Sequence, residues 1–164
     1  MKVIVADSST LIALLDTNNF NLLFNIFDEI IIANEVYREI IRRNSHHLTM
    51  DNYIKHCQIL CQSIEYDEFY EMLVKRLDRG ESESIVLAKR MGFPLMIDEK
   101  KGRAIATSLG VGIVGLVGVI LKLMDIKAVT KDRAIKIINE VEANNFRLSN
   151  ELKKLIYEYS PRST

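Results

Sequence analysis

Acidic side chains stand at four separated points of the chain where an α/β fold would bring them together. Asp7 and Asp98 each follow a short apolar run that is typical of a buried strand, and Glu39 lies in a helical segment after another such run. The fourth position is Glu81 or Glu83, at the start of a helix with an apolar period. In open α/β sheets the ligand crevice lies outside the carboxyl ends of the strands, so we expect these carboxylates to converge there.

Carboxylates that gather at one place repel one another unless a cation lies between them. An all-oxygen ligand set favours Mg²⁺ or Mn²⁺, which points to metal-dependent phosphoryl chemistry. Asp7 and Asp98 would bind the ion directly or through water, while Glu39 and Glu81 would bind through water or position the nucleophile. Ser9 is expected to orient Asp7 or a nearby water by hydrogen bonding.

Each acid taken alone also has a structural explanation. Asp7 would serve equally well as a turn or capping residue, and Asp98 followed by Glu99 fits an N-cap with a first-turn acid. Negative charge at the start of a helix, as at Glu81 and Glu83, complements the helix macrodipole. The functional interpretation therefore rests on the joint arrangement.

Basic side chains lie close to these acids in the sequence and could contact phosphate groups. They are Lys100, Lys101 and Arg103 after Asp98, Arg42 and Arg43 after Glu39, and Arg79 before Glu81. Each one singly is better explained by a solvated helix face.

The bulk composition predicts one globular domain. With 164 residues, 48% of them hydrophobic, the chain suffices for a single domain over residues 1–164, with a core at about 2–128 and helices at about 131–158. A net charge of zero argues against a protein that coats nucleic acid electrostatically. The longest apolar run, residues 111–121, falls short of the roughly 20 residues that span a bilayer, so we predict a cytoplasmic protein with no membrane partner.

The two cysteines, Cys57 and Cys61, offer an alternative metal site. Together with His46, His47 and His56 they could bind zinc, but the sequence lacks the four-ligand spacing of structural zinc sites. Two reduced thiols are the simpler interpretation.

Predicted strands alternate with predicted helices along the chain. The strands are at residues 2–6, 30–32, 57–64, 94–97 and 111–114, and the helices include 66–77, 81–91 and 100–109. Residues 78–80 are predicted to form a turn, and residues 44–56 have no assignment. This order is typical of βαβ units, and it predicts a three-layer α/β/α domain with a central parallel sheet.

The motifs in this order resemble those of PIN-domain proteins. They are VADSS, VYREI, GESESIVLA and LMIDEKKGRAIA, followed by GVGIVGLVGVIL. More narrowly, they are similar to the prokaryotic branch related to VapC-type toxins, in which G-E-x-E-A-I precedes D-[DE]-x-x-G-R and a G-x-x-G-V-L helix. The resemblance covers about residues 2–155, and GESESI departs from the pattern only by Ser84 in place of alanine.

The resemblance implies a Mg²⁺- or Mn²⁺-dependent endoribonuclease that cleaves single-stranded RNA. The implied catalytic residues are Asp7, Glu39, Glu81 and Asp98, of which Asp7, Glu81 and Asp98 bind metal. Glu99 is a helper in this scheme. Many relatives are toxins held inactive by a small antitoxin and form homodimers, so an RNA substrate, an antitoxin and a second copy are the expected partners.

The third acid of the set is either Glu81 or Glu83. Alignment on the following I-x-L-A favours Glu81, and residues two apart on a helix point about 200° away from each other. Glutamate here replaces the aspartate that many active relatives carry, which predicts contact with the metal through water. Glu83 then has a supporting role.

Two other classes of function compete with a nuclease. A non-catalytic PIN-like module that binds RNA or protein would fit the neutral charge and the apolar stretch at residues 111–124. A phosphatase or nucleotide hydrolase would need a glycine loop that cradles phosphate, and the sequence has none that we recognise.

Overall fold

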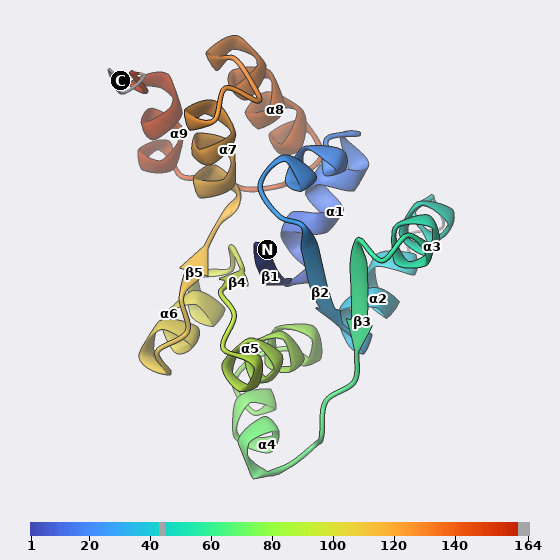
Figure 1. Ribbon diagram of the computed structural model, residues 1–164. Helices are drawn as coiled ribbons and strands as arrows, with labels where there is room; N and C mark the ends of the chain where they lie inside the picture. The colour runs from blue at the N-terminus through green and yellow to red at the C-terminus, as the bar shows by residue number, and fades with distance from the viewer. Residues whose placement is uncertain (43–44, 161–164) are drawn as a thin grey trace.

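The computed structural model describes residues 1–42 and 45–160 as one sheet with helices on both faces (Figure 1). The strands in these ranges are β1 (Val3–Ala6), β2 (Glu29–Ala33), β3 (Ile59–Gln62), β4 (Leu95–Met96) and β5 (Ile113–Val114). They pair in the order β3-β2-β1-β4-β5, and every pairing is parallel. The predicted α/β class with a central parallel sheet is confirmed. Arg43, one of the predicted cations, lies outside the described residues.

The apolar β-branched runs become strands because both faces of the sheet are covered. All four residues of β1 are buried, and in β2 the run Ile30–Ile32 is buried on both sides. A strand covered on both faces needs a continuous apolar run instead of alternation, and that is what the sequence supplies. The parallel register places Val5 opposite Ile31 on one side and Leu95 on the other.

Helices pack on the two faces of this sheet. They are α1 (Ser8–Asp16), η1 (Phe20–Asn25, a 3₁₀ helix), α2 (Asn34–Ile41), α3 (His47–Lys55), α4 (Glu68–Val74), α5 (Arg79–Met91), α6 (Lys100–Ser108), α7 (Leu116–Asp125), α8 (Lys131–Ala143) and α9 (Asn150–Tyr157). In Figure 1, α1, α7 and α8 lie above the sheet, and α4, α5 and α6 lie below it. No helix among those described is long and apolar enough to cross a bilayer.

The structure differs from the predicted elements at three places. The helix predicted at 66–77 spans only Glu68–Val74, because Asp67 accepts a hydrogen bond from the Tyr70 amide and starts the helix there. The unassigned segment at 44–56 contains α3. The predicted turn at 78–80 is in fact the start of α5, with Asp78 as its N-cap.

The sheet changes direction between β1 and β4. From β1 the chain proceeds to β2, and from β4 it proceeds to β5 on the opposite side, so β1 and β4 form a topological switch point. Ligands of open α/β sheets bind outside the carboxyl ends of the strands at such a point. Asp7 directly follows β1 and Asp98 follows β4 by one residue, and the Asp7 amide donates to the Met96 carbonyl at 2.9 Å.

Candidate active site

Asp7 is a buried carboxylate with one oxygen that has no hydrogen-bond partner. The residue is 3% exposed, and the Ser9 hydroxyl donates to Oδ2 at 3.3 Å. Oδ1 is fully buried and has no partner among the described residues. The pKa of Asp7 is raised to about 7, mainly by burial; the carboxylates of Asp78 and Glu39 contribute to the rise, and hydrogen bonds from the Ser8 amide and the Ser9 hydroxyl oppose it. A buried oxygen left in this way requires a proton or a cation.

Glu39 reaches the same region from α2. Its half-buried carboxylate interacts with the Ser8 hydroxyl, while burial and the charge of Asp78 raise its pKa. It lies against Gly80 in the first turn of α5, where a Cβ atom would be 2.6 Å from Oε1 of Glu39. The absence of a side chain at Gly80 is therefore what lets Glu39 occupy this position.

Glu81 joins the cluster through the start of α5. The Asp78 carboxylate accepts from the Glu81 amide at 2.8 Å, and the Glu81 carboxylate accepts from the Asp78 amide at 3.2 Å, which makes a capping box. Burial raises the pKa of Glu81 to about 7, with Asp78 and Asp7 as the next largest causes and Glu99 as a smaller one. The structure thus brings Asp7, Glu39 and Glu81 within electrostatic reach of Asp78, and their role as a metal site stays a prediction.

Asp78 is an acid of this cluster that our sequence interpretation missed. It influences the pKa of Asp7, Glu39 and Glu81 alike, and it is exposed. The sequence carries a signal for it, because Asp78 and Glu81 stand in the D-x-x-E spacing of a capping box. The prediction of a turn at residues 78–80 is wrong, because Asp78 is the N-cap of α5.

Glu83 points away from this cluster. It is 1% exposed, and its carboxylate accepts from the Glu35 amide at 3.0 Å and from the Tyr66 hydroxyl at 2.7 Å. Glu35 lies in the first turn of α2, whose own N-cap residue Ala33 provides no side-chain bond. Glu83 therefore caps α2 from a neighbouring helix, which explains why this carboxylate is buried.

Asp98 lies at the carboxyl end of the sheet, but its carboxylate has other partners. Its oxygens accept from the Thr10 hydroxyl and, at 3.1 Å, from the Leu116 amide at the start of α7. Burial raises the pKa of Asp98, and Thr10, Leu116 and Arg103 oppose that rise. Among the described groups, these partners and not the other acids dominate its environment. A role for Asp98 as a metal ligand stays a prediction.

Three consecutive hydroxyls in the first turn of α1 connect to three different acids. Ser8 interacts with Glu39, Ser9 donates to Asp7, and Thr10 donates to Asp98. Of these contacts the sequence predicts only the one between Ser9 and Asp7, and the structure contains it. Because the three hydroxyls lie in one turn, α1 helps to position acids that come from α2 and from the ends of β1 and β4.

The residues at the start of α6 are the predicted helper Glu99 and the predicted phosphate contacts Lys100, Lys101 and Arg103, and they differ in their contacts. Glu99 is the N-cap of α6 and accepts from the Gly102 amide at 2.8 Å. Arg103 is half-buried and donates to the Ile97 carbonyl at 2.8 Å. Lys100 and Lys101 are exposed. Of these four residues, the two lysines are therefore free of the contacts that hold Glu99 and Arg103 in the fold.

The carboxylate cluster fits a divalent ion by its chemistry. Within residues 1–42 and 45–160, no three acidic, imidazole or thiol side chains are already arranged closely enough to hold a metal. The unpartnered Oδ1 of Asp7 and the raised pKa values of Asp7 and Glu81 indicate, however, that neither carboxylate has a basic partner among the described residues. A hard cation with oxygen ligands would supply positive charge there. In the alternative zinc set, Cys57 is exposed and the Cys61 thiol donates to Asn34 at 3.1 Å.

Comparison with known proteins identifies the family of this fold. A PIN-domain family model matches residues 3–160, and the chain belongs to that family. A solved PilT N-terminus domain protein from the hyperthermophilic archaeon Sulfolobus solfataricus is similar, with a TM-score of 0.51 and 15% identity over 74% of this chain and 92% of that one. At this identity the likeness supports the fold alone. No curated protein matches. PIN domains are generally nucleases that use divalent metals.

Replacing Gly80 with alanine tests the placement of Glu39. The new Cβ atom would displace the Glu39 carboxylate, and we expect nuclease activity to fall about 10- to 100-fold. Stability should change by no more than about 1 kcal/mol, because a flexible carboxylate can move and alanine favours a helix over glycine. Gly112→Ala is the matched control, since its Cβ would meet Pro94 at an ordinary 3.9 Å. Unchanged turnover in Gly80→Ala would show that the position of Glu39 does not matter.

Proposed function

We propose that the protein is a divalent-metal-dependent endoribonuclease that cleaves single-stranded RNA, and that it is the toxin of a VapC-type toxin–antitoxin pair. The observation that supports this most strongly is the unpartnered buried oxygen of Asp7 beside Glu39, Asp78 and Glu81. Burying several carboxylates without a cation is unfavourable, so a fold that keeps them together points to a function for them. Membership of a nuclease family supports the same reaction class.

The acids have two kinds of role in the proposed reaction. Asp7, Glu81 and Asp98 are the proposed metal ligands, with Mg²⁺ or Mn²⁺ as the ion because the donors are oxygens. A bound ion would make an attacking water more acidic and would offset charge on the phosphate. Glu39 would orient the attacking water, since its carboxylate is held by the Ser8 hydroxyl and by packing against Gly80. Thr10 would hold Asp98 in place.

The proposed partners follow from the resemblance. An antitoxin and a second copy of the chain would each need apolar surface on this protein. Leu152 and Leu155 in α9 are 39% and 51% exposed and supply such surface beside a cavity of about 320 Å³ that Asp98 also lines.

The test of the proposed function is an RNA cleavage assay with purified protein that carries no partner. We expect cleavage of mixed-sequence single-stranded RNA with Mg²⁺ or Mn²⁺, no cleavage with EDTA, and recovery when metal is added back. A duplex of the same sequence should be cleaved more slowly. If varied RNAs are bound but never cleaved under any of these metal conditions, the protein is a non-catalytic RNA-binding module.

A further inference from the structure

An exposed aromatic ring lies within electrostatic reach of two arginines near the acidic cluster. The residues are Tyr66, which precedes α4, Arg38 in α2 and Arg79 at the start of α5, and we call them the Tyr66 surface. They come from three separate segments of the chain. Nothing in the proposed catalytic steps uses any of them.

The Tyr66 ring is held in one orientation although it is exposed. Its hydroxyl donates to the buried Glu83 at 2.7 Å, and its ring packs on Tyr70 with centroids 4.6 Å apart at 54°. Even so, the residue is 52% exposed. A ring that is fixed at its hydroxyl and on one side offers a rigid apolar surface, and a planar ligand can stack on it at little entropic cost.

The two arginines are also held by contacts that leave donors available. Arg38 donates to Glu35 at 3.1 Å, and its side chain remains 55% exposed. Arg79 interacts with Tyr70, and that interaction raises its pKa. A guanidinium has five donors, so each arginine retains several for a phosphate group. Tyr66 lies within electrostatic reach of both.

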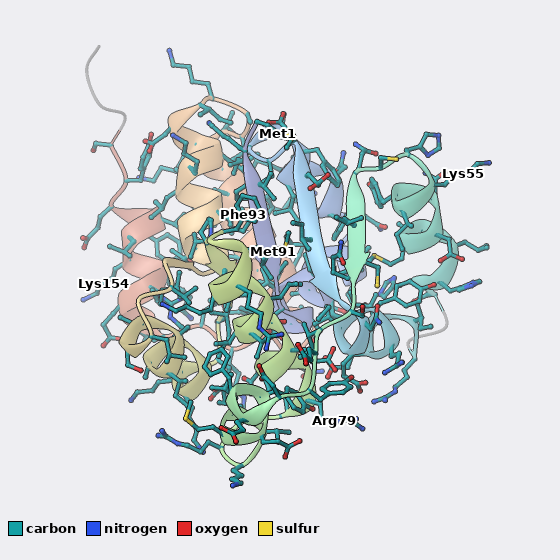
Figure 2. The ribbon with its side chains drawn as sticks, turned by 60° about the horizontal axis from the view of Figure 1, so that its bottom comes forward. Met1, Lys55, Arg79, Met91, Phe93 and Lys154 are labelled. Atoms are coloured by element: carbon teal, nitrogen blue, oxygen red, sulfur yellow. The ribbon has the colours of Figure 1, made fainter. Side chains whose placement is uncertain are left out.

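The two arginines of the Tyr66 surface are sequence neighbours of residues in the acidic cluster. Arg38 directly precedes Glu39, and Arg79 directly precedes Gly80, the residue against which Glu39 packs. Figure 2 shows the strands running from the end of the molecule marked by Met1 toward the end marked by Arg79. Arg79 therefore lies at the carboxyl end of the sheet, where the acids gather.

We propose that the Tyr66 surface is a substrate subsite, on which an unpaired RNA base stacks on Tyr66 while Arg38 and Arg79 bind the flanking phosphates. Stacking on an aromatic ring requires a base that is free of its own neighbours, so the subsite selects single strands. The inference rests on the proposed function for the position of the scissile bond, but not for the binding itself.

Acidic side chains in the groove that Tyr66 lines restrict the path of the strand. The groove between Tyr66 and α4 is lined by the acids Asp67, Glu68 and Glu71 together with Met72 and Lys75. Phosphates would be repelled there. The strand would therefore extend from Tyr66 past the arginines toward Glu39 and Asp7.

The test measures binding apart from cleavage. A short fluorescein-labelled single-stranded RNA of mixed sequence is titrated with protein in EDTA, and the anisotropy is followed. We expect Tyr66→Leu to weaken binding about tenfold or more, because a base–aromatic stack is lost, and Tyr66→Phe to stay within about twofold. Both variants lose the hydroxyl bond to Glu83, so any effect of losing that bond is common to them, and Tyr66→Leu alone also loses the ring contact with Tyr70. Tyr157→Leu, at an exposed tyrosine of α9, is the control.

Salt dependence tests the arginines. Each phosphate contact on a single strand contributes about 0.7 to the slope of log binding constant against log salt. Arg38→Gln and Arg79→Gln should each reduce that slope by about this amount, and Arg147→Gln, at an exposed arginine between α8 and α9, should leave it unchanged.

Any of several binding results would overturn the subsite. These are equal binding by Tyr66→Leu and Tyr66→Phe, equal affinity of wild type for a duplex and a single strand, and an effect of Tyr66→Leu on a protein partner but not on RNA. Metal-dependent cleavage that proceeds equally well in wild type and Tyr66→Leu would contradict this inference and leave the proposed function standing. RNA binding that depends on Tyr66, without cleavage in the presence of either Mg²⁺ or Mn²⁺, would support the subsite and contradict the proposed function.

Discussion

Asp7→Asn is expected to abolish metal-dependent RNA cleavage and, at the same time, to stabilise the metal-free protein at pH 8. The loss should be at least about 100-fold, since even a group that only orients a metal ligand is worth 10- to 100-fold. The gain in stability follows from burial. Asp7 is 3% exposed with one oxygen unpartnered, so a charge there is unfavourable, and asparagine carries none.

The sign of the pH dependence follows from the raised pKa. Burial, with Asp78 and Glu39 nearby, raises the pKa of Asp7 from 3.8 to about 7. Between pH 4 and 7 the unfolded chain has lost a proton that the folded protein still holds, so the stability of the metal-free protein falls as pH rises. The loss is complete above pH 7. At about 1.36 kcal/mol for each tenfold change in a proton equilibrium, it is on the order of 4 kcal/mol.

Chemical unfolding of the metal-free protein at pH 5 and pH 8 measures this effect. Wild type should be less stable at pH 8, and Asp7→Asn should show a weaker dependence, with Glu81 supplying the remainder in the same direction. Mn²⁺ should raise the stability of wild type at pH 8 and should not raise that of Asp7→Asn. Asp132→Asn, the same chemical change at an exposed residue, is the control. A wild type that is equally stable at both pH values would contradict the account of Asp7.

The second large effect separates two glutamates that are two residues apart. Glu83→Ala should destabilise the protein by about 3 kcal/mol or more. It leaves the Glu35 amide and the Tyr66 hydroxyl without an acceptor and opens a cavity among buried groups. Glu81→Ala should change stability by about 1 kcal/mol or less, because a lost capping bond is offset by relief of repulsion from Asp7 and Asp78.

RNA cleavage should be affected more by Glu81→Ala than by Glu83→Ala, the opposite of their order in stability. Glu81→Ala should lose RNA cleavage by about 100-fold, whereas Glu83→Ala, assayed at a temperature where it remains folded, should keep most of it. Thermal unfolding and initial rates on one RNA substrate give both numbers. If Glu83→Ala is stable but inactive while Glu81→Ala is active, the third acid is Glu83 and the assignment is wrong.

The sheet and the acids at its strand ends could be predicted because they depend on local patterns. Apolar runs predict buried strands, and parallel strands place their carboxyl ends together, so Asp7 and Asp98 had to lie at one edge. The choice of Glu81 over Glu83 followed from helix geometry, and the structure puts their carboxylates in different surroundings.

The remaining features depend on contacts between distant segments. Glu83 caps a helix that begins 49 positions earlier, at Asn34, and Thr10 holds Asp98 from 88 positions away. No periodicity of the sequence shows such contacts. Asp78 is different, because its D-x-x-E spacing with Glu81 is a local pattern that predicts a capping box. The prediction of a turn at this place overlooks that pattern. Arg103 resembled a phosphate-binding cation in sequence, yet it donates to a strand-end carbonyl.

The central claim is that the acids at the switch point share a divalent ion. Calorimetric titration of Mn²⁺ into wild type at pH 8 tests it most directly, with Asp7→Asn, Glu81→Gln and the control Asp132→Asn measured alongside. The account predicts saturable binding in wild type and Asp132→Asn and its loss in the other two. The absence of binding in wild type, or binding that is unchanged in Asp7→Asn, would contradict it.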